Sequence, residues 1–159
     1  MKCTDGIIIC AEKLMQSKLL VPSTDHRVYM ADEHIGVTIT GVIPEGRNLV
    51  NRAKEEAKQY RNLYGVPIPV DVLAERMSLY VHYYTLSLMG RPIGATIIIC
   101  GFDNLKGLSL YMVEPSGICY VKLYRHIMDV HMEKDVKQQR MKLKDLCYIK
   151  KQLMKHYQP

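Results

Sequence analysis

One segment constrains the fold more than any other: residues 95–101, which read Ala-Thr-Ile-Ile-Ile-Cys-Gly. The run has the length of a strand and is almost continuously apolar, without the alternation that marks a half-exposed strand. A strand of this kind has no face that can be left in water, so it belongs in the centre of a sheet covered on both sides. The chain must therefore fold into stacked layers.

Other segments supply the rest of the sheets. Asp32-Glu33-His34 separates two runs rich in β-branched residues, which predicts a hairpin. Asp103 to Gly107 and Glu114-Pro115-Ser116-Gly117 have the composition of turns, so the central strand continues into a three-stranded meander. The predicted strands are residues 6–10, 12–20, 28–31, 35–40, 95–101, 108–113 and 118–123.

Helices are predicted in two pairs. Pro44 and Glu45 suit the first turn of a helix that ends at Gly65, and the rigid Pro67-Ile68-Pro69 link leads into a second helix with Asp71 in its first turn. The expected apolar stripes are Leu49, Ala53, Ala57, Tyr60 and Tyr64 on the first helix and Leu73, Met77, Tyr80, Tyr84 and Leu88 on the second. Arg52 and Glu56 have the i, i+4 spacing of an ion pair.

Two further helical patterns, about Met128 to Met141 and Leu143 to His156, end the sequence. The order of strands, two helices, strands and two helices predicts an α+β fold in four layers, with two packed sheets between two helix layers. With 159 residues and 48% hydrophobic composition, we expect residues 1–159 to form a single domain.

Composition excludes several classes of protein. No apolar run approaches the roughly 18 residues of a membrane span, so we expect no integral membrane protein. The first residues lack the pattern of a secretory signal. The five cysteines are odd in number and lie mostly in apolar segments, which favours reduced thiols in an intracellular compartment.

The net charge of +6 is concentrated at one end of the sequence. From Lys122 onward there are ten basic and four acidic residues, interleaved with apolar residues on the predicted helices. A solvated helix face explains this pattern, and a small basic nucleic-acid-binding module that uses Lys150, Lys151 and Lys155 is the alternative.

The sequence carries no motif for metal or nucleotide chemistry. It has no Gly-rich phosphate loop, no Gly-x-Ser-x-Gly elbow and no Cys-x-x-Cys pair. His126 and His131 are five residues apart and fall on different faces of a helix. Cys10, Cys100 and Cys119 lie in apolar strands, where a thiol has a raised pKa. We therefore predict no metal and no cofactor.

Several segments together resemble proteasome alpha subunits. They are Asp5-Gly6-Ile7-Ile8, Ala11-Glu12-Lys13-Leu14, Asp32-Glu33-His34-Ile35-Gly36, Arg47-Asn48-Leu49, Leu73-Ala74-Glu75-Arg76, Tyr80-Val81-His82, Arg91-Pro92-Ile93-Gly94 and Glu114-Pro115-Ser116-Gly117. The resemblance covers nearly the whole sequence, weakens after Leu123, and is closest to the seventh position of the alpha ring.

The resemblance implies the N-terminal-nucleophile hydrolase fold and a non-catalytic, structural role in the outer ring of the 20S core particle, which serves ubiquitin-dependent protein degradation in cytoplasm and nucleus. In the catalytic relatives a terminal Thr is the nucleophile. Here Thr4 precedes the first strand, Glu12 matches the family's Asp, and Arg27 replaces the Lys that assists the nucleophile. Because a guanidinium keeps its proton, Arg27 is no base. An active threonine-type hydrolase, with Thr4 as nucleophile, is the alternative.

The resemblance also implies contacts. Arg27 matches a residue that lines a pocket for the terminal carboxylate of a regulatory ATPase tail, although an ordinary strand-edge Arg fits equally. Arg47, Asn48, Arg52 and Glu55, exposed on the first helix, are expected to face neighbouring alpha subunits and the beta ring. The terminal segments usual in the family are absent from the sequence, so no gating role is inferred.

Overall fold

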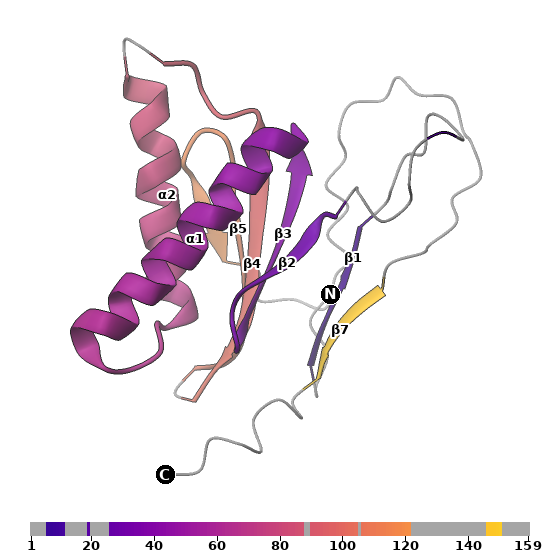
Figure 1. The fold of residues 1–159 in the computed structure, drawn as a ribbon, viewed down its shortest axis with the longest axis vertical. Coiled ribbons are helices and arrows are strands. Elements are labelled where there is room, and N and C mark those ends of the chain that lie inside the picture. Colours follow the sequence, from indigo (N-terminus) through magenta and orange to yellow (C-terminus); the bar gives the residue numbers. More distant parts are fainter. Residues whose placement is uncertain are drawn as a thin grey trace.

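The computed structural model of the chain describes residues 6–11, 19, 26–87, 90–104, 106–121 and 146–150. Strands precede and follow a pair of helices, as predicted from the sequence (Figure 1). The elements are β1 (Gly6–Cys10), β2 (Val28–Asp32), β3 (Ile35–Gly41), α1 (Ile43–Tyr64), α2 (Val70–Leu86), β4 (Ala95–Asp103), β5 (Gly107–Val113), β6 (Cys119–Val121) and β7 (Leu146–Lys150).

Five of the strands form one antiparallel sheet in the order β2-β3-β4-β5-β6. The apolar strand β4 is central, as predicted, because Ile99 pairs with Val37 of β3 on one side and with Tyr111 of β5 on the other. β1 and β7 pair with each other in a separate two-stranded sheet. The described part of the chain therefore has an α+β fold with two antiparallel sheets.

The two helices form where the sequence predicts them. α1 has Pro44 and Glu45 in its first turn and ends at Gly65, whose φ of 71° is left-handed and whose N–H bonds to the carbonyl of Arg61 at 2.9 Å. The link of two prolines leads into α2, whose first turn holds Asp71. Both helices lie on the same side of the larger sheet (Figure 1).

The main core lies between the helices and the larger sheet. Leu49 and Ala53 of α1, Met77 of α2 and Ile97 and Ile99 of β4 are all completely buried there. Full burial of the Leu, Met and Ile side chains contributes about 1.5–3 kcal/mol each relative to exposure. This interface is the principal source of stability for the helix layer.

The opposite face of the larger sheet is covered by β1. Ile7 and Ile9 of β1 form a second buried cluster with Cys100 of β4 and Leu110 of β5. Alternate residues of β4 thus face the helices and β1, which confirms that this strand is covered on both sides. Helices, five-stranded sheet and two-stranded sheet make three successive layers.

Three details of the helix stripes differ from expectation. Tyr64 is 59% exposed, and its ring packs on that of Tyr60, with 4.4 Å between the ring centres, instead of entering the core. Tyr80 and Tyr84 are only half-buried, while Val81 takes the core position. Leu88 lies outside the described residues. No helix in the described ranges is long and apolar enough to cross a membrane.

The predicted helix from Leu143 to His156 is wrong at its centre, where Leu146–Lys150 is strand β7. The spacing of apolar residues suggested a helix, but this segment contains Tyr and Ile, which favour strands, and it pairs in register with Ile-rich β1. The predicted helix from Met128 to Met141 and most of the extended stretch at 12–20 lie outside the described residues. Of the predicted strand 118–123, residues 119–121 are observed.

Candidate functional site: the outer surface of the helix layer

The residues predicted to contact other subunits occupy different parts of the helix layer. Arg47 and Asn48 are exposed near the beginning of α1, and Glu55 is exposed halfway along it. Arg52 was expected to be exposed but is half-buried, with 35% of its side chain accessible, because it turns toward α2. Only part of the predicted set is therefore presented outward.

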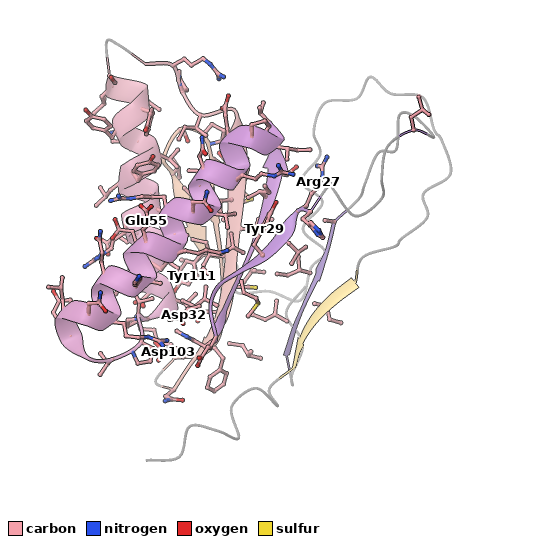
Figure 2. The ribbon with its side chains drawn as sticks, in the orientation of Figure 1. Arg27, Tyr29, Asp32, Glu55, Asp103 and Tyr111 are labelled. Atoms are coloured by element: carbon pink, nitrogen blue, oxygen red, sulfur yellow. The ribbon has the colours of Figure 1, made fainter. Side chains whose placement is uncertain are left out.

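Arg27 lies just before β2, at the end of the sheet where α1 begins (Figure 2). Its carbonyl accepts hydrogen bonds from the N–H of Ile39 at 3.0 Å and from the hydroxyl of buried Thr38 at 2.9 Å. These bonds fix the backbone of Arg27 to β3, and its side chain is half-buried. Arg27 is thus a well-positioned cation, close in the fold to the first turn of α1.

A buried carboxylate joins the two helices. Glu56 of α1 pairs with Arg52 one turn earlier, as predicted, and with Arg76 of α2 at 3.0 Å. Its side chain is 11% exposed, whereas the two arginines are 35% and 32% exposed. A carboxylate at this depth needs charged partners, and the two guanidinium groups supply them.

Each of these arginines also stacks on a tyrosine of the other helix. The guanidinium of Arg52 lies 5.2 Å from the ring centre of Tyr80, and that of Arg76 lies 5.4 Å from the ring centre of Tyr60. The hydroxyl groups of Tyr80 and Tyr84 are 3.1 Å apart, and this hydrogen bond together with burial raises the pKa of Tyr80 to about 12. Tyr80 is therefore a neutral helix-contact residue.

A second set of contacts holds the segment that follows α2. The carboxylate of Glu45, in the first turn of α1, accepts a hydrogen bond from the N–H of Gly94 at 2.7 Å and forms an ion pair with Arg91. The Gly94 N–H, followed by the Arg91 guanidinium, lowers the pKa of Glu45 below its usual value. We call these three residues the Glu45 clasp. It fixes the chain entering β4 to the beginning of α1.

A cavity of about 260 Å³ opens beside the Glu45 clasp. Its walls combine apolar residues with two tyrosines, a glutamate, an asparagine and an arginine. The lining residues are Glu45, Asn48, Leu49, Tyr80, Tyr84, Gly90, Arg91, Pro92 and Ile93. Asn48, one of the predicted contact residues, thus lines a hollow between the beginning of α1 and the end of α2.

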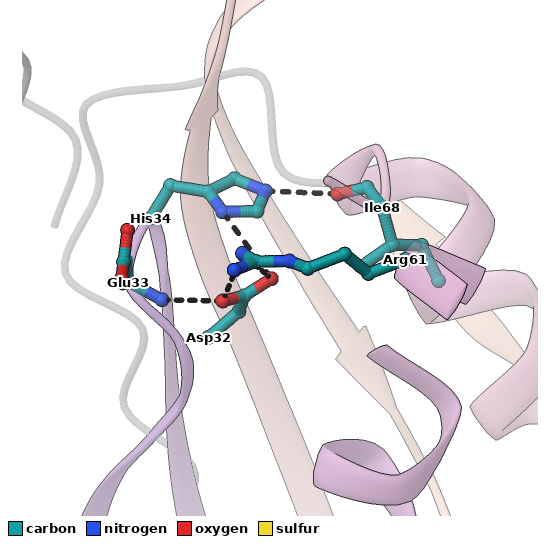
Figure 3. A network of polar contacts seen from close by, with 5 residues as sticks. All are labelled: Asp32, Glu33, His34, Arg61 and Ile68. Carbon is teal, nitrogen blue, oxygen red and sulfur yellow. Dashed lines mark hydrogen bonds and ion pairs between the residues drawn. The ribbon is translucent and has the colours of Figure 1, made fainter. Parts of the chain in front are cut away.

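Another polar network ties the β2–β3 turn to the far end of α1 (Figure 3). The carboxylate of Asp32 accepts two hydrogen bonds from Arg61, at 2.7 and 2.9 Å, and one from the N–H of Glu33. His34 Nδ1 lies 3.8 Å from Asp32, and its Nε2 lies 2.8 Å from the carbonyl of Ile68. Because a carbonyl only accepts, His34 Nε2 is the donor of this bond, and the network joins the β2–β3 turn both to α1 and to the link before α2.

The described residues assemble no catalytic constellation. The predicted nucleophile position, Thr4, and its companion Glu12 lie outside the described residues. Cys100 is buried and donates to the carbonyl of Gly36 at 3.3 Å, and burial raises the pKa of Cys119, so neither thiol is activated. Within the described ranges, no three His, Cys, Asp or Glu residues are grouped as metal ligands.

The sequence did not predict that Arg76 and Glu45 form ion pairs between distant elements. Arg76 meets Glu56 across 20 positions in the sequence, and Glu45 meets Arg91 across 46, so no local spacing rule relates them. The signal was present in the motifs themselves, because Arg76 closes Leu73-Ala74-Glu75-Arg76 and Arg91 opens Arg-Pro-Ile-Gly. Both motifs thus serve to lock the helix layer to its surroundings.

The fold and these contacts define an α+β domain in which ion pairs and hydrogen bonds hold two helices on an antiparallel sheet. Comparison with known proteins identifies the family of this domain. The proteasome subunit family model matches residues 1–126. The chain therefore belongs to the proteasome subunit family.

Its relatives within the family include alpha-type subunits. The chain is 45% identical to proteasome subunit alpha type-3 of Spinacia oleracea over 119 residues, which are 75% of this chain and 47% of the relative. It is 47% identical to the probable proteasome subunit alpha type-7 of Saccharomyces cerevisiae over 73% of this chain and 40% of the relative. For alpha type-3 of Drosophila melanogaster the identity is 35%, over 71% and 45%. The chain spans about half the length of these relatives.

Proposed function

We propose that the chain is a non-catalytic, structural subunit of the outer alpha ring of the 20S proteasome core particle. The observation that carries this proposal is the helix layer. α1 and α2 are locked to each other by Glu56 and to the sheet by the Glu45 clasp, yet their outer surface is exposed. A rigid, exposed surface of this kind suits permanent contact with neighbouring subunits.

The absence of catalysis is supported by the residue at the position of the family's assisting Lys. Arg27 holds a guanidinium, which cannot release its proton at any useful pH. It therefore cannot act as the base that activates a terminal nucleophile. We therefore propose that this subunit supports a proteolytic particle without catalysing the reaction. Through that particle it would serve ubiquitin-dependent degradation. Its proposed location is the cytoplasm and the nucleus.

For the complete fold we propose the four-layer sandwich of the N-terminal-nucleophile hydrolases. The three described layers support it, because β1 already packs against the sheet face opposite the helices. A second helix layer over the β1–β7 sheet completes the arrangement.

For partners we propose neighbouring alpha subunits and the beta ring, contacted through Arg47, Asn48, Arg52 and Glu55. We also propose that Arg27 binds the terminal carboxylate of a regulatory ATPase tail. Its backbone is fixed by Thr38 and Ile39, and a guanidinium can fork onto a carboxylate. Binding of a tail peptide to assembled particles that contain wild type or Arg27→Ala, with the C-terminally amidated peptide as control, tests the role of Arg27.

Fractionation of cell extract by native size tests the main proposal. A tagged full chain is expected to migrate with the peptidase activity of the core particle. A free monomer with no particle-sized pool would overturn the structural role. Treatment with a Thr-directed electrophile is expected to leave Thr4 unmodified, and an adduct at Thr4 would instead establish a hydrolase.

A further inference from the structure

The cavity beside the Glu45 clasp has no part in the proposed function, and contacts on both of its sides hold its walls in place. The ring of Tyr84 meets the ring of Tyr80 edge-on, with 5.2 Å between the ring centres, and the ring of Tyr83 edge-on at 5.9 Å. The ion pair of Arg91 with Glu45 fixes the segment that supplies the rest of the lining. The cavity is therefore preformed, as small-molecule sites usually are.

The size and charge of this cavity restrict what it can hold. Its volume of about 260 Å³ is just below the range of drug-sized sites, which is about 300–1,000 Å³, so one ring with a small substituent fits. Glu45 and Arg91 are the two charged residues of the lining, and they neutralise each other. An uncharged ligand is therefore favoured, because a charged one would lose hydration without meeting an unpaired counter-ion.

The polar groups of the lining suit a ligand that both donates and accepts hydrogen bonds. The Asn48 side chain is exposed, and its amide carries donor N–H groups and an acceptor oxygen. The hydroxyl groups of Tyr80 and Tyr84 lie 3.1 Å apart, and their mutual bond uses one of their two hydrogens. The other hydrogen is left for a ligand. An amide is the small uncharged group that offers a donor and an acceptor side by side.

We propose that this cavity binds a small uncharged aromatic carboxamide, with its ring beside Tyr80 and Tyr84 and its amide paired with Asn48. Aromatic walls favour a planar ring, which can meet them edge-to-face or offset-stacked. The apolar part of the lining, which includes the fully buried Leu49, excludes water from the other side of the ring. This inference is drawn from the cavity and does not rest on the proposed function.

The test is titration of the purified full chain with benzamide, followed by ligand-observed NMR and by the shift in unfolding temperature. Two analogues each change one property of the probe. Benzoate replaces the amide by a charge, and cyclohexanecarboxamide keeps the amide on a saturated ring. Benzamide is expected to bind about tenfold more tightly than either analogue. Benzoate that bound as tightly as benzamide would indicate an anion site at Arg91, and equal binding of the saturated amide would exclude a role for the aromatic walls; either result would overturn the proposal.

A matched pair of variants locates the site. Asn48→Leu removes the amide from the lining and is expected to weaken benzamide binding about three- to tenfold, the effect of one lost hydrogen bond. Asn51→Leu makes the same change at an exposed position of α1 that does not line the cavity, and it should leave binding unchanged. Equal binding by the two variants would place the probe elsewhere and overturn the proposal.

Filling the cavity gives an independent test. Gly90 lies in the lining, and a Cβ added there would make only ordinary contacts, at 3.6 Å from the Ser87 hydroxyl and 3.8 Å from the Tyr84 ring. Gly90→Leu is therefore expected to fold and to lose benzamide binding, because its side chain takes space beside Tyr84. Binding retained by folded Gly90→Leu would overturn the proposal. If urea unfolding shows that Gly90→Leu is unstable, the pair at Asn48 and Asn51, both on the exposed surface of α1, decides the question.

Discussion

Gly117 lies directly against His82, so closely that a Cβ on the glycine would be 2.5 Å from the Cβ of the histidine. The turn that contains Gly117 rests on α2, where Ser78 donates a hydrogen bond to the Gly117 carbonyl and His82 Nδ1 lies 3.4 Å from the carbonyl of Ser116. Gly117 also has a φ of 83°. Two family motifs, Tyr-Val-His and Glu-Pro-Ser-Gly, are therefore two sides of one contact.

Substitution of this glycine is expected to destabilise the domain for two separable reasons. Gly117→Ala adds left-handed strain of about 1–2 kcal/mol, and overpacking against His82 adds about 1–3 kcal/mol. Gly65→Ala is the matched control, since Gly65 has a φ of 71° and nothing within 4 Å of an added Cβ. Urea unfolding should show a larger loss for Gly117→Ala. Equal losses would mean that the contact with His82 relaxes freely.

Removal of the buried charge at Glu56 is the second prediction. Glu56→Gln keeps the shape of the side chain but leaves Arg52 and Arg76 without their shared carboxylate, which we expect to cost about 1–3 kcal/mol because the arginines are partly exposed. Glu55→Gln, whose side chain is 63% exposed, should change the free energy of unfolding by less than about 0.5 kcal/mol. A comparable effect of both substitutions in urea unfolding would contradict a special role for Glu56.

The main elements of the fold could be predicted because their determinants are local. The apolar run at 95–101 identified the central strand, and the stop signal at Gly65 with the two prolines after it separated the helices. Tyr64 was misplaced because periodicity does not report which positions of a helix its neighbouring elements cover. The strand Leu146–Lys150 was misassigned because its partner, β1, is more than a hundred residues away.

The contacts of the helix layer were predictable only where they are local. Arg52 and Glu56 are four residues apart, so their pairing followed from helix geometry. The Asp32–Arg61 pair and the pairing of Arg76 with Glu56 join different elements, and no spacing in the sequence relates them. The tertiary fold decides which partner each of these charges meets.

The Glu45 clasp makes stability depend on pH in a defined direction. The Gly94 N–H and the Arg91 guanidinium favour the ionised carboxylate, so the pKa of Glu45 in the folded chain is below its usual value of 4.5. The clasp therefore stabilises the fold fully above pH 4.5, and this stabilisation is lost as the pH falls through the lowered pKa of the folded state.

Comparison of wild type with Glu45→Gln isolates this effect from other carboxylates. Asp71, whose pKa is lowered by its hydrogen bond to Lys106, titrates in both chains and cancels in the difference. We expect the difference in urea midpoint between the two chains to be constant near neutral pH and to shrink below pH 4.5. Added salt should reduce it, because Arg91 is 73% exposed and its charge is screened. A difference that stayed constant as the pH fell through this range would show that protonation of Glu45 does not weaken the clasp, which would contradict the lowered pKa.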